Sequence, residues 1–157
     1  MNLHWGIDPG LGGAVGIIGD GGEFVAVYDM PTLPTTTGRR QIDAAALAGI
    51  LRQHQPVFTL LERVGARPGE GDVGAFSFGQ TFGAILGVLA ALELWHDLIQ
   101  PAVWKRRAGI AAGADKRASV AICKRLIPGA ADHLTGVKDD GRAEALLLAL
   151  QGRARQA

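Results

Sequence analysis

Residues 3–19 read LHWGIDPGLGGAVGIIG, and this stretch decides the fold. One apolar run ends at Asp8, a glycine-rich turn follows, and a second apolar run begins at Ala14. This pattern predicts two strands joined by a tight turn. A carboxylate at the inner end of a buried strand is costly unless a positive charge offsets it. Asp8 is therefore the first candidate for a functional residue.

Strand and helix patterns alternate along the rest of the chain. We expect further strands at residues 23–30, 57–62 and 98–100, the second of them almost entirely apolar. Helices are expected at 42–54 with Asp43 as N-cap, at 79–94, at 115–127 and at 141–153. The segments 31–40, 63–78 and 128–138 are expected to be loops. The order predicts an α/β fold with a mixed sheet, and 157 residues predict a single domain.

Composition excludes few functions, but the distribution of charge is informative. The net charge is only +1, yet basic residues gather between positions 105 and 125 and acids are scarce there. A basic face beside an acidic pocket suits a protein that cleaves phosphodiesters, although a solvated charged surface gives the same pattern. The lone Cys123 favours a core position in a reducing compartment. Because glycines and Glu93 interrupt the apolar run 82–94, we expect no membrane span and no membrane partner.

Three further acids occur in apolar settings like that of Asp8. Glu62 ends the expected strand 57–62, and Glu144 lies within the apolar last helix. Asp140 precedes Glu144 by four residues, so both side chains share one helix face, while Asp139 is its neighbour. Oxygen ligands of this kind select Mg²⁺ or Mn²⁺, and four carboxylates around two such ions can support phosphodiester hydrolysis.

Each acid also has a local interpretation. Asp8 can hydrogen-bond into the glycine turn, as turn-forming aspartates do. Glu62 can pair with Arg63 or Arg67 at a sheet edge, and Asp140 can be an N-cap. Glu144 is harder to explain in this way, because its helix is apolar on nearly every side.

Two cations occur where helix geometry disfavours them. If Asp115 is an N-cap, Lys116 and Arg117 lie in the first helical turn, against the helix dipole. A phosphate group bound there would reverse the sign of that interaction. Lys105 could reach the same place, although tolerated surface charges remain the simpler alternative.

Five motifs together resemble RuvC-type Holliday-junction resolvases of the ribonuclease H-like superfamily, especially phage-type members. The motifs occur in the family's order: Gly6–Gly10, the strand-final Glu62, Gly79–Gly83, Val103–Arg106 with Lys116, and Asp139–Leu147. The resemblance spans nearly the whole chain. One departure concerns the last acidic pair, which is commonly three residues apart and ends in Asp. Here the spacing is four, the second acid is Glu144, and Gly141 takes the place of the first acid.

The resemblance implies a single ribonuclease H-like endonuclease domain over residues 1–157. It implies a homodimer that binds four-way DNA junctions and makes paired, metal-dependent nicks in DNA recombination and repair, in the cytoplasm of a bacterial or phage-infected cell. The metal ligands, for two Mg²⁺ or Mn²⁺ ions per site, would be Asp8, Glu62, Asp140 and Glu144. Lys116 would be both catalytic and DNA-binding, and the other DNA contacts would be Lys105, Arg106, Arg107 and Arg117.

Other functions fit parts of the same pattern. A nuclease with broader specificity, cutting branched or flap DNA, would carry the same chemistry. A nucleotide-binding module of the actin and sugar-kinase class also begins with a Gly-Ile-Asp-like strand and a glycine turn, but it needs two such lobes. A DNA-binding protein without activity would not need the four acids.

Overall fold

A five-stranded mixed sheet forms the centre of the computed structural model, which describes residues 1–65, 69, 71–136 and 139–156. The strand order is β3-β2-β1-β6-β7. Strands β1 (Leu3–Asp8), β2 (Ala14–Gly19) and β3 (Phe24–Asp29) are antiparallel neighbours. Strands β6 (Phe58–Glu62) and β7 (His96–Ile99) run parallel to β1. The predicted mixed sheet is therefore confirmed.

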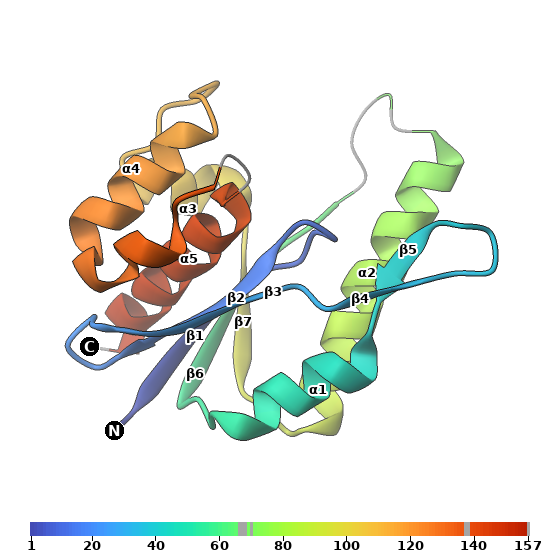
Figure 1. Ribbon diagram of the computed structural model, residues 1–157, viewed down its shortest axis with the longest axis horizontal. Helices are drawn as coiled ribbons and strands as arrows, with labels where there is room; N and C mark the ends of the chain where they lie inside the picture. The colour runs from blue at the N-terminus through green and yellow to red at the C-terminus, as the bar shows by residue number, and fades with distance from the viewer. Residues whose placement is uncertain (66–68, 70, 137–138, 157) are drawn as a thin grey trace.

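Helices cover both faces of this sheet (Figure 1). On one face lie α1 (Ala44–Gln53), α2 (Asp72–Ala91) and a small hairpin of β4 (Thr32–Pro34) and β5 (Arg40–Ile42). On the other face lie α3 (Pro101–Arg107), α4 (Arg117–Leu126), a 3₁₀ segment (Pro128–His133) and α5 (Asp140–Gln156).

The alternation of side chains in β1 determines which helices approach which face. Trp5 and Ile7 are fully buried against α1 and α2. Gly6, between them, faces α5, where an added Cβ would lie 2.0 Å from the carbonyl oxygen of Ala145. At Gly16 in β2, an added Cβ would lie 2.6 Å from the backbone nitrogen of Leu146. The two glycines therefore allow α5 to lie directly on the sheet.

The structure differs from the sequence prediction mainly in the segments expected to be loops. Residues 31–40 were predicted to lack regular structure, but they contain β4 and begin β5. The loop predicted at 63–78 is shorter, because α2 already begins at Asp72, and residues 66–68 and 70 lie outside the described part. Pro128–His133 forms a 3₁₀ helix within the predicted loop 128–138. Residues 137 and 138 of that loop also lie outside the described part of the chain.

Helix α3 and the start of α4 correct two further predictions. Pro101 was expected only to end a strand, but it occupies the first turn of α3, where its missing N–H costs nothing. Helix α4 begins at Arg117 with Lys116 as the capping residue. Asp115 does accept a hydrogen bond from the backbone N–H of Arg117, at 2.9 Å, so it satisfies one free donor of that helix.

Helix α2 is long and apolar enough to cross a membrane, as judged by length and composition alone. The mean hydropathy of its most apolar 18-residue stretch is 1.5, and 22% of that stretch is buried inside the molecule. The glycines that we expected to interrupt an apolar span therefore do not lower its hydropathy below that of a membrane helix.

Candidate active site

Two carboxylates meet where neighbouring parallel strands end. Asp8 is the last residue of β1 and Glu62 the last residue of β6, and these strands pair side by side with Ile7 opposite Leu61. Glu144 reaches the same region from α5. Burial raises the pKa of Asp8 to about 7, and the negative charges of Glu62 and Glu144 add to this effect. Two of the other three predicted metal ligands therefore lie close enough to Asp8 to raise its pKa electrostatically.

The first turn of α5 lies directly against the glycine turn that follows β1. A Cβ added at Gly141 would lie 2.4 Å from the carbonyl oxygen of Gly12 and 3.4 Å from Oδ2 of Asp8. No side chain fits at position 141 with this backbone. This steric limit explains why the chain has no acid there, and Asp140 is the nearest preceding position that can carry one.

Asp139 and Asp140 have different partners. Asp139 accepts a hydrogen bond from the backbone N–H of Gly136 at 2.5 Å and lies 3.6 Å from the guanidinium of Arg142. It therefore links Gly136 to the residue directly before α5. Asp140 instead pairs with Lys116, with 3.2 Å between Oδ2 and Nζ. The geometry favours Asp140 over Asp139 as the acid that serves the site, although the charge of Asp140 is not among those that raise the pKa of Asp8.

Lysines from the basic segment contact the acids on α5. Nζ of Lys105 lies 3.0 Å from Oε1 of Glu144, and the hydroxyl of Ser119 donates to the same oxygen at 3.2 Å. The carboxylate of Glu144 is thus held from two sides. Lys116 differs, because its side chain is 83% exposed and free to meet a ligand beyond Asp140.

Trp104 and Ser119 are site residues that the sequence reasoning missed. The indole of Trp104 is fully buried and donates a hydrogen bond from Nε1 to Oε2 of Glu62 at 2.6 Å. Its position directly before Lys105 in a recognised motif was the available signal. Ser119 is buried in the first turn of α4, and nothing in the sequence marked it as a site residue.

Two adjoining cavities open beside these acids. The larger has a volume of about 680 Å³ and is lined by Glu144, Ser119, Lys105, Arg106, Lys116 and the turn at 109–115. The second, of about 410 Å³, is lined by Asp140, Lys116, Arg117 and Lys124 among others. Arg107 is exposed at the end of α3 and lines neither cavity. Four of the five predicted DNA-binding residues are therefore brought together around the acids.

The donor set of this site is suited to a hard cation. Within the described residues, no three His, Cys, Asp or Glu side chains are already arranged to hold a metal ion. At two of the acids a lysine ammonium group lies where a cation would bind: Lys105 pairs with Glu144, and Lys116 pairs with Asp140. The four acids offer only oxygen atoms, and the pKa of Asp8 is raised mainly by burial and further by the charges of Glu62 and Glu144, which Lys105 only partly offsets. A divalent ion therefore fits these residues chemically.

Comparison with known proteins supports the same assignment of the fold. The chain is similar over 98–100% of its length to two solved structures, both 17–18% identical in sequence. These are the T. thermophilus RuvC in complex with Holliday junction substrate, with a TM-score of 0.72 and 97% of that chain covered, and the Thermus thermophilus RuvC structure, with a TM-score of 0.58 and 96% covered. The fold is that of RuvC. The predicted ribonuclease H-like fold is confirmed.

A protein that is similar in sequence is also named as a Holliday junction resolvase. The chain is 32% identical over 117 residues to the Holliday junction resolvase MOC1, chloroplastic, of Chlamydomonas reinhardtii. The match covers 71% of this chain but only 13% of that protein's length. No family model matches the chain. The resemblance to RuvC-type resolvases that the motifs indicated is thus supported independently by sequence and by structure.

Proposed function

We propose that this chain is a metal-dependent endonuclease that resolves four-way DNA junctions by paired nicks. One observation carries the proposal: on a RuvC fold, Asp8, Glu62 and Glu144 converge beside a basic segment that pairs with the acids of α5. The similarity to the MOC1 resolvase supports the same substrate class.

The four acids would hold the metal ions, with Asp8, Glu62 and Glu144 in the centre and Asp140 at the exposed side. Bound divalent ions would supply an activated water and charge stabilisation at the scissile phosphate. Neighbouring side chains hold the carboxylates of this site in fixed orientations. Trp104 orients the carboxylate of Glu62, and Ser119 orients that of Glu144. Burial and the neighbouring carboxylates raise the pKa of Asp8 to about 7 in the metal-free chain, and a divalent ion would favour the ionised form that binds it.

The basic residues would hold the DNA strand over the acids. Lys116 is largely exposed and needs only to leave Asp140 to reach a phosphate. Lys105 is more enclosed, at 35% exposure, and remains close to Glu144. Arg106 and Arg117 line the adjoining cavities and add positive charge along the path. An exposed, flexible lysine is suited to contact the backbone phosphates of many sequences.

The main test compares Glu62→Gln with the parent chain on labelled DNA in Mg²⁺. Gln keeps the size and an acceptor for Trp104 but removes the charge, so cleavage should fall by orders of magnitude while junction binding persists. Glu93→Gln makes the same change at an exposed position beyond α2 and serves as the control. Normal cleavage by Glu62→Gln would refute the proposed chemistry. A panel of four-way junction, flap, fork and duplex separates a resolvase from a broader branched-DNA nuclease.

We further propose that the active form is a homodimer joined through α2. Paired nicks on a symmetric junction need two sites related by a two-fold axis. Only four of the twenty residues of α2 are buried, and, apart from the helix's own backbone, no atom of the described residues lies within 4 Å of a Cβ added at Gly79, Gly83 or Gly87. This open, apolar face suits close packing with a second copy.

The dimer proposal is tested by light scattering with and without a junction. The parent chain should have twice the mass of one chain, and Gly83→Arg should be monomeric with unchanged secondary structure. A control, Gly49→Arg, adds the same charge at an open position on α1. A parent chain that stays monomeric both free and on DNA would refute the proposal.

A further inference from the structure

A third cavity, also polar, lies on the opposite side of the sheet from α3–α5. It has a volume of about 560 Å³ and is enclosed between the β4–β5 hairpin and the first half of α2. These two segments are separated by α1 and β6 in the chain and come together only in the fold (Figure 1). The volume falls in the range that accommodates a small ligand, about 300–1,000 Å³.

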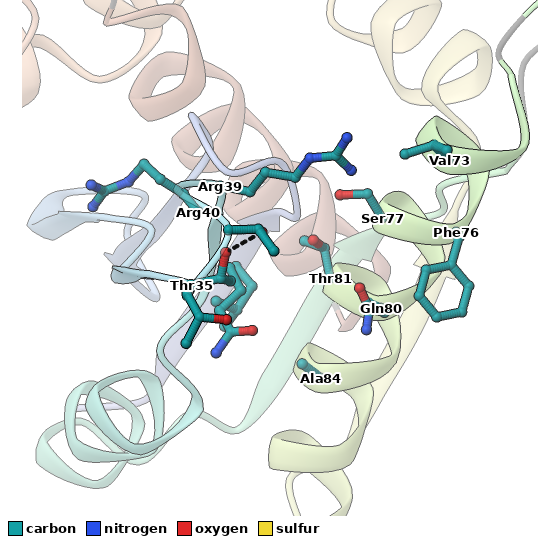
Figure 2. Close-up of a pocket in the computed structure, with 13 residues that line it drawn as sticks. Thr35, Arg39, Arg40, Val73, Phe76, Ser77, Gln80, Thr81 and Ala84 are labelled. Carbon is teal, nitrogen blue, oxygen red and sulfur yellow. Dashed lines mark hydrogen bonds between the residues drawn. The ribbon is translucent and has the colours of Figure 1, made fainter.

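The lining of this cavity is basic and rich in hydroxyl groups. Its thirteen residues include two arginines and no acid, together with Ser and Thr from both walls. Figure 2 shows that the side chain of Arg39 extends from the hairpin towards Ser77 on α2, with Thr81 and Gln80 one turn further along the helix. Guanidinium, hydroxyl and amide donors facing one space form a set that suits phosphate oxygens.

The two arginines have separate roles. Arg40 donates to the hydroxyl and the carbonyl oxygen of Thr32, so it braces the hairpin. In the described part of the chain, no acidic side chain pairs with Arg39, which is exposed. Arg39 therefore has a full positive charge available to a ligand, held over the cavity by a hairpin that Arg40 stabilises.

We propose that this cavity binds a backbone phosphate of the DNA, with Arg39 as the charged contact and Ser77 as a hydrogen-bond donor. The inference rests on the proposed function for the identity of the nucleic acid. It adds a contact on the α2 side of the sheet, distinct from the basic segment of α3 and α4. A DNA arm held there would be fixed at two places on one chain, on either side of the acids.

The test measures binding of the full chain to a fluorescent four-way junction and to a duplex, in Ca²⁺ or EDTA, across a range of salt concentrations. Loss of one phosphate contact should reduce the salt slope by about 0.9, which corresponds to about fivefold weaker binding at about 0.15 M salt. We expect this change for Arg39→Gln. Arg39→Lys keeps the charge and should retain the slope.

Arg52→Gln is the matched control, because it removes the same charge from an exposed position at the end of α1, outside the cavity. Ser77→Asp places a carboxylate inside the cavity and should weaken binding more than Arg39→Gln. Equal affinity and salt slope for Arg39→Gln and Arg52→Gln would overturn the inference, while cleavage by the parent chain would leave the proposed function intact. Conversely, an Arg39-dependent slope in a chain that binds DNA but cleaves nothing would support the cavity and refute the nuclease.

Addition of inorganic phosphate distinguishes a backbone phosphate from a free anion as the ligand. If the cavity serves the DNA backbone, millimolar phosphate at constant ionic strength should leave the difference between Arg39→Gln and Arg52→Gln unchanged. If phosphate abolishes that difference, the cavity is a site for free anions, and the inference about DNA fails.

Discussion

Helices α5 and α2 both contact the sheet, and both lie beside glycines, but the glycines have opposite consequences. On the α5 side, Gly6 and Gly16 leave no space for a Cβ, because the helix backbone occupies it. Along α2, Gly79, Gly83 and Gly87 face open space among the described residues, and most of the helix is at least partly exposed. The glycines beside α5 therefore mark a contact already made within the molecule, whereas those three on α2 mark a surface left open. The position of Glu144 in the candidate site depends on the close contact of α5 with the sheet that Gly6 and Gly16 allow.

The largest effect should come from filling the contact between β1 and α5. Gly6→Ala places a Cβ 2.0 Å from the carbonyl oxygen of Ala145, so the helix must move or the strand must distort. We expect a loss of about 3 kcal/mol in the free energy of unfolding, at the upper end of overpacking effects. Urea denaturation measures it. A loss below about 1 kcal/mol would show that α5 can shift away from the sheet easily.

A smaller effect should follow from the charge of Asp8. Burial and the neighbouring carboxylates raise its pKa from 3.8 in the unfolded chain to about 7 in the fold. The stability that the protonated form contributes is complete below pH 3.8 and is lost as the pH rises through about 7. In EDTA, Asp8→Asn should therefore become increasingly more stable than the parent chain between pH 4 and pH 7, the window set by these two values.

The measurement is thermal unfolding at several pH values, with Asp132→Asn as a control at an exposed position. Mg²⁺ should raise the melting temperature of the parent chain at pH 8 and have less effect on Asp8→Asn, because one ligand is lost. A constant difference between the two chains across this pH range would contradict the raised pKa.

The smallest effect should appear on α2. In Gly83→Ala the added Cβ meets no atom of the described residues within 4 Å outside the helix's own backbone. Because the change also removes a flexible residue from a helix interior, the free energy of unfolding should rise by up to about 1 kcal/mol. Urea denaturation of dilute protein measures this gain. If Gly83 lies against a second copy, the gain should shrink as the protein concentration rises. Destabilisation in dilute solution would mean that α2 is covered by its own chain.

The sequence predicted the elements whose pattern is local. The apolar run that ends at Asp8, the buried strand that ends at Glu62 and the N-cap at Asp43 were all expected, and Asp43 accepts a hydrogen bond from Ala46 N–H as an N-cap does. The roles of the site residues stay predictions. The fold does bring Glu62 and Glu144 close enough to Asp8 to raise the pKa of Asp8, as their shared setting on apolar elements suggested.

The features that the sequence did not predict depend on contacts between distant segments. The β4–β5 pair has only three residues in each strand, too few to show an alternating pattern in the sequence. Gly141 could be explained only once α5 was placed against the turn after Asp8. The hydrogen bond between Trp104 and Glu62 joins residues 42 positions apart, and no local pattern encodes it.

That hydrogen bond also has a spectroscopic consequence. The chain contains three tryptophans, of which Trp5 is buried on the α1–α2 face, Trp95 is exposed and Trp104 alone touches a carboxylate of the site. Any ligand that withdraws charge from Glu62 changes the electric field across the indole of Trp104 and hence its emission. The fluorescence of Trp104 therefore reports on ligand binding at the acidic centre, and Trp104→Phe, which lacks this fluorophore, is the reference.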